Sequence, residues 1–121
     1  MKTQSKLGVT ISKPYLIYTA ILTQVLTDAP IVTVLENTLS GVIVWTRTST
    51  GIYLGTLAAA FPLGKTWAIA QYNGSGGDAK VGLKLFRLSN DTVQLVSYDS
   101  SEIPYELHSE IEEYIEIRVY P

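Results

Sequence analysis

Eight short stretches rich in Val, Ile, Leu, Thr, Tyr and Trp fill nearly all of this chain, and clusters of Gly, Asn, Asp, Ser or Pro separate them. This spacing is typical of an all-β protein. We expect strands at residues 15–24, 31–36, 42–47, 52–57, 66–72, 81–88, 92–98 and 114–120. The pattern predicts an antiparallel β-sandwich or a jelly-roll-like barrel of about eight strands.

The first and last of these stretches differ in how apolar residues alternate. Residues 15–24 are apolar at both odd and even positions, which predicts a strand buried on both faces. Residues 114–120 alternate, so Ile115, Ile117 and Val119 should point inward, and Glu116 and Arg118 outward.

One segment favours a helix. Leu107 and Ile111 are four residues apart, which would place them on one face of a short helix near residues 105–113. No other helix is predicted.

The chain has the length of one domain, with 121 residues and no cysteine, so packing alone must stabilise it. We expect a single β-domain at residues 14–121, preceded by a basic N-terminal arm at residues 1–13. No apolar run has the length of a membrane span or of a signal-peptide core. These features predict synthesis in the cytoplasm and no membrane partner.

Charge is distributed unevenly along the chain. The net charge of −2 argues against a nucleic-acid partner. Residues 1–98 hold eight basic and four acidic side chains, whereas residues 99–121 hold seven acidic and one basic. This asymmetry is either ordinary solvated surface or a complementary contact between copies. The arm residues Lys2, Lys6 and Lys13 are the candidates for docking to an acidic surface.

Candidate chemistry is sparse. His108 is the one histidine and lies among acidic residues, so we expect it on the surface. The acidic run near it lacks the residue order of a calcium-binding loop. The glycine-rich segment at residues 73–78 does not match a phosphate-binding motif, and Gly74, Gly76 and Gly77 are expected at an exposed loop tip. We therefore expect no catalytic residues, no bound metal and no cofactor.

Aromatic residues in the predicted strands have two interpretations. Trp45, Tyr53, Trp67 and Tyr72 could line a carbohydrate-binding face, because aromatic rings stack on sugar rings. Aromatic residues in strands more often pack in the core or form cross-strand pairs. Exposure of two or three of these rings in a line would distinguish a sugar-binding module from ordinary packing.

The chain also resembles a known group of proteins. Residues 14–121 are similar to short virion proteins of tailed phages that infect Bacteroidetes-type hosts, including crAss-like phages. The similar segments are PYLIYTAILTQ, DAPIVTVLENTLSGVIVWTRTSTGIYLGTL and YIEIRVYP. Members of this group are head fibres, capsid auxiliary proteins or tail-associated modules, and the matching segments contain no catalytic signature.

The resemblance implies a structural role in the virion. The expected partners are other copies of this chain, in a trimer or another multicopy assembly, and virion proteins such as the capsid. Surplus apolar surface on several strands fits self-association. The alternative is a carbohydrate- or receptor-binding module of a phage tail or fibre.

Overall fold

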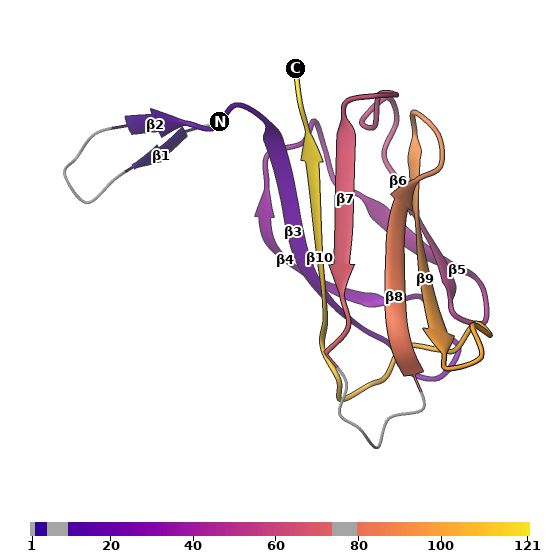
Figure 1. The fold of residues 1–121 in the computed structure, drawn as a ribbon. Coiled ribbons are helices and arrows are strands. Elements are labelled where there is room, and N and C mark those ends of the chain that lie inside the picture. Colours follow the sequence, from indigo (N-terminus) through magenta and orange to yellow (C-terminus); the bar gives the residue numbers. More distant parts are fainter. Residues whose placement is uncertain (1, 5–9, 74–79) are drawn as a thin grey trace.

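The computed structural model describes residues 2–4, 10–73 and 80–121, and within them the protein is all-β (Figure 1). Two four-stranded antiparallel sheets have the strand orders β4-β3-β10-β7 and β5-β6-β9-β8. The strands of the first sheet are β3 (Leu16–Thr23), β4 (Ile31–Asn37), β7 (Thr66–Gln71) and β10 (Glu113–Val119). Those of the second are β5 (Val44–Ser49), β6 (Ile52–Thr56), β8 (Lys80–Arg87) and β9 (Thr92–Asp99). The predicted eight-stranded sandwich is confirmed, and the sheets do not close into a barrel.

The core lies between the two sheets. Strand β10 alternates as predicted, with Ile115, Ile117 and Val119 buried in the core. Opposite them, the second sheet contributes residues such as Tyr53, Val93 and Leu95. Removing this apolar surface from water supplies the main stabilisation, since the chain has no disulfide.

Strand β3 is buried less completely than predicted. Its even-numbered residues Tyr18, Ala20 and Leu22 belong to the core. On the opposite face Ile17 is buried, but Thr19 and Ile21 are only half-buried. No second layer covers that face among the described residues, so burial on both sides was wrong for most of the strand.

The predicted helix near residues 105–113 does not form. This segment crosses the end of the sandwich without regular structure, and its backbone bonds to the sheets instead. The Tyr105 N–H donates to the Ser97 carbonyl at 2.8 Å, and the Leu107 N–H donates to Gln24 Oε1 at 3.1 Å. Leu107 itself is buried in the core. These tertiary bonds replace the local bonds of a helix, which a two-turn segment forms only weakly alone.

The N-terminal arm contains two short strands that the sequence did not predict. Strands β1 (Lys2–Gln4) and β2 (Thr10–Ser12) pair antiparallel, with Lys2 opposite Ser12. In Figure 1 this hairpin lies to one side of the two sheets. Strands β1 and β2 thus belong to neither of the two larger sheets.

Each sheet has one edge strand that lies beside the other sheet and one edge strand that is open. Strand β7 lies beside β8, where the two sheets approach each other (Figure 1). The remaining edge strands are β4 in the first sheet and β5 in the second. Within residues 2–4, 10–73 and 80–121, these two strands have a neighbouring strand on one side only.

Candidate functional site

The outward side of the first sheet combines exposed apolar and aromatic side chains with an arginine. Strand register places Glu116 of β10 between Thr19 of β3 and Ile69 of β7. One step along, Arg118 lies opposite Trp67. We call this surface the outer face; its residues are Thr19, Leu35, Trp67, Ile69, Gln71, Tyr114, Glu116 and Arg118.

Large apolar side chains are exposed on the outer face. Leu35 is 62% exposed, Ile69 50% and Trp67 43%. The solvent-facing side of an antiparallel sheet usually carries polar residues. Exposed apolar side chains grouped in this way are typical of an interaction surface.

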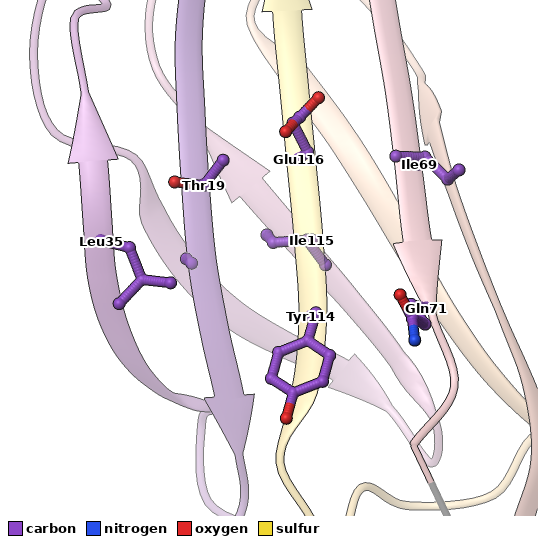
Figure 2. A pocket seen from close by; sticks show the side chains of 8 residues that line it. Thr19, Leu35, Ile69, Gln71, Tyr114, Ile115 and Glu116 are labelled. Carbon is purple, nitrogen blue, oxygen red and sulfur yellow. The ribbon is translucent and has the colours of Figure 1, made fainter.

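A shallow depression of about 330 Å³ lies on the outer face. Figure 2 shows Leu35 on one side of it and Ile69 on the other, with Tyr114, Thr19 and Glu116 between them. Leu35 reaches this position because β4 has an extra residue there: Thr19 pairs with Glu36 and Ala20 with Val34, which leaves Leu35 without a partner in β3. Such a bulge redirects a side chain locally.

Arg118 is held between two aromatic rings. Its guanidinium carbon is 4.7 Å from the centre of the Tyr15 ring and 4.8 Å from that of Trp67. Its Nε donates to Glu116 Oε2 at 2.8 Å. Contact with the Tyr120 side chain, and then with Glu116, raises the pKa of the Arg118 guanidinium. The charge of Arg118 is therefore permanent and largely compensated.

A second depression, of about 260 Å³, adjoins this stack. Lys13, Tyr15, Leu16 and Tyr120 are among its lining residues. Lys13 Nζ lies 3.1 Å from Glu36 Oε2, which ties the end of the N-terminal arm to strand β4. Of the three docking candidates, Lys13 is thus already paired within the chain.

A polar cluster sits at the other end of the sandwich and consists of Gln24, Arg47, Tyr53 and Glu106. The Glu106 carboxylate accepts hydrogen bonds from Arg47 Nε at 3.0 Å and from the Gly51 N–H at 2.8 Å. Gln24 Nε2 donates to it at 3.2 Å. Gln24 Oε1 in turn accepts from the Tyr53 hydroxyl and from the Leu107 N–H.

This polar cluster has a structural role. Burial raises the pKa of the Tyr53 phenol, and the hydrogen bond from Leu107 opposes this only in part. Tyr53 is therefore neutral and donates a proton to Gln24 in a hydrogen bond. Every member fixes residues 105–107 against the sheets, in place of the predicted helix.

The four aromatic candidates are separated by the fold. Trp45 and Tyr53 are buried in the core, and Trp45 Nε1 donates to the Tyr18 hydroxyl at 3.2 Å. Tyr72 is half-buried and Trp67 is exposed. The interpretation of all four residues as one sugar-stacking face is therefore wrong, because the rings of Trp45 and Tyr53 lie inside the core and cannot reach a sugar.

The other candidate residues are placed as follows. Lys2 lies in β1, while Lys6, Gly74, Gly76 and Gly77 fall outside the described residues. His108 is exposed, as predicted. In the described part of the chain, no group of three or more His, Cys, Asp or Glu side chains could hold a metal ion. No helix there has the length and hydropathy of a membrane span.

Sequence reasoning missed Leu35, Ile69, Arg118 and Glu106. The alternation of β10 placed Arg118 outward, but nothing in the sequence indicated that β7 and β3 would flank it. Glu106 was assigned to a solvent-facing helix. Comparison with protein-family models, curated protein sequences and solved structures found no match to this chain.

Proposed function

We propose that this protein is a structural component of a phage virion, a head fibre or capsid auxiliary protein, that associates with other copies of itself and docks to the particle. The observation that carries this proposal is the set of exposed apolar side chains on the outer face, Leu35, Trp67 and Ile69. The resemblance of residues 14–121 to virion proteins supplies the setting.

The composition of the outer face suits a protein contact. Trp, Tyr and Arg are the residues most enriched at the energetic centres of interfaces, and Trp67, Tyr15 and Arg118 form one stack here. The charge of Arg118 is compensated by Glu116 within the same chain. A partner can therefore cover this surface without leaving an uncompensated charge buried.

Self-association is tested by the mass of the purified protein in solution, measured by light scattering over a range of concentrations. We expect a mass of at least twice the 13.3 kDa of one chain. The variant Ile69→Lys should weaken association at least about tenfold, because it places a charge in the apolar part of the contact. Thr56→Lys, at an exposed position of the second sheet, is the matched control and should leave the mass unchanged.

Two results would contradict self-association through the outer face. One is a wild-type protein of 13.3 kDa at every concentration. The other is equal masses for wild type and Ile69→Lys. The unfolding midpoint of each variant shows whether a lower mass reflects a lost contact or a damaged fold.

Docking to the particle is tested separately in the N-terminal arm. The double variant Lys2→Glu/Lys6→Glu should reduce incorporation into purified particles about tenfold or more, because it reverses the charge that faces an acidic surface. Lys65→Glu/Lys84→Glu changes the net charge equally, at exposed sites outside the arm, and should be incorporated normally. Normal incorporation of the arm variant would refute the docking role.

A further inference from the structure

Strand β4 presents an open edge with an unusual composition. It is the end strand of its sheet, so one side of its backbone has no neighbouring strand among the described residues. Ile31 is 52% exposed and Val34 44% exposed, and Leu35 is exposed as well. Natural sheets usually protect edge strands with charges, prolines, bulges or short length. Residues 31–34 contain no charge and no proline, and the bulge of β4 lies after them, at Leu35.

The one charge of β4 is compensated within the chain. Glu36 follows the apolar stretch, and Lys13 Nζ lies 3.1 Å from its carboxylate. A strand that pairs with this edge would therefore meet no unbalanced charge. The open edge of the second sheet is more polar, since β5 ends in Thr46, Arg47, Thr48 and Ser49.

Residues Ile31, Val32, Thr33, Val34 and Leu35 form a palindrome in chemical character. A two-fold axis through Thr33 would place Thr33 opposite its own copy and Val32 opposite Val34. Ile31 would lie beside Leu35. Threonine pairs and β-branched pairs are favourable directly across two antiparallel strands. A two-fold interface requires this self-complementarity, because each residue and its partner exchange places across the axis.

We propose that two copies of this protein pair through their β4 edges, antiparallel and in the register centred on Thr33. The first sheet then continues across the axis into the first sheet of the partner. This contact rests on the proposed self-association and specifies one of its interfaces. The outer face supplies a different contact, so the two together build an assembly of more than two copies.

The bulge at Leu35 limits the length of the contact. Regular pairing of β4 with β3 runs from Ile31 to Val34, and the register shifts at Leu35. The ladder across the axis therefore centres on Val32, Thr33 and Val34. Leu35 contributes its side chain beside Ile31 rather than a ladder position.

A single cysteine tests the register directly, because the chain has none of its own. In the proposed pairing the two Thr33 Cα atoms are about 4.5–5.5 Å apart, within the range that a disulfide spans. Thr33→Cys should therefore form a covalent dimer under mild oxidation. Ile31→Cys is the control on the same edge: its two copies would lie about 13 Å apart along the strand and should not cross-link.

A second variant tests the contact without oxidation. Thr33→Lys places two like charges face to face across the axis, which should weaken this dimer contact at least about tenfold. Thr56→Lys serves again as the exposed control. Both variants should keep the unfolding profile of the isolated domain, since Thr33 and Thr56 are both exposed.

The outcomes separate this contact from self-association in general. A wild-type multimer in which Thr33→Cys does not cross-link, or cross-links no faster than Ile31→Cys, overturns pairing through β4 and leaves association through the outer face intact. A wild-type monomer at all concentrations overturns both. Selective cross-linking at Thr33, with a lowered mass for Thr33→Lys, supports the two-fold contact.

Discussion

Replacing Gly51 with alanine should destabilise the protein by about 3 kcal/mol or more, the sum of backbone strain and a steric clash. Gly51 has a φ of 67°, in the left-handed region that favours glycine. A Cβ at this position would lie 2.5 Å from the backbone nitrogen of Tyr105 and 2.7 Å from the carbonyl oxygen of Ser97. Because both atoms belong to backbone, neither can rotate away.

Gly64 provides the matched control for this effect. It also has a positive φ, of 77°, but a Cβ there would meet no atom within 4 Å. Gly64→Ala should therefore cost only the backbone strain, about 1 kcal/mol. Urea unfolding of the two variants measures the difference, and equal free energies of unfolding would mean that residue 105 does not pack against Gly51 as described.

Replacing Glu106 with alanine should lower the free energy of unfolding by about 2–3 kcal/mol, because it leaves several polar groups unpaired at once. The carboxylate accepts from Arg47 at 3.0 Å, from the Gly51 N–H at 2.8 Å and from Gln24 at 3.2 Å. The segment that covers this end of the core should also become more mobile. Hydrogen exchange at Leu107, whose N–H bonds to Gln24 and Tyr53, reports that change.

Glu116 is the control for the loss of a carboxylate. Its side chain is 27% exposed, close to the 23% of Glu106, and it also pairs with an arginine. Glu116→Ala should nevertheless cost only about 0–1 kcal/mol, as surface ion pairs do. Urea unfolding compares the two at a protein concentration where the protein is monomeric, because Glu116 lies on the proposed contact surface. A loss as large as that of Glu106→Ala would contradict the view that the number of hydrogen bonds, rather than exposure, sets the difference.

The strand positions were predictable because alternation is a local property. All eight sandwich strands lie within two residues of the predicted limits, and the inward side of β10 was assigned correctly. Side chains in a strand point to opposite faces in turn, so the order of apolar and polar residues reveals the buried side. No knowledge of neighbouring strands is needed for this step.

The segment near residues 105–113 shows where local reasoning fails. Leu107 and Ile111 have helical spacing, but the backbone of this segment bonds to Gln24, Tyr53 and Ser97. Tyr53 and Ser97 lie in strands β6 and β9, and Gln24 directly follows β3. The spacing of apolar residues gives no information about these distant partners. Whether the backbone of residues 105–113 would form helical hydrogen bonds or bonds to the sheets could therefore not be decided from the sequence.

The candidate surface was predictable only in its parts. The sequence placed Glu116 and Arg118 on the outward side of their strand, and it suggested surplus apolar surface. It did not indicate that Trp67 and Tyr15 would enclose Arg118, nor that a bulge would turn Leu35 toward Ile69. The aromatic residues likewise looked equivalent in sequence, yet Trp45 and Tyr53 are core residues and Trp67 is not.

The sequence by itself determined the class of fold, the strand limits to within two residues and the side of β10 that faces the core. These depend on interactions between residues a few positions apart. Only the tertiary structure decided the strand order, the register and the residues that share the outer face or the polar cluster. The reason is distance along the chain: Gln24 and Glu106 are 82 positions apart, and such contacts form only when the sheets assemble.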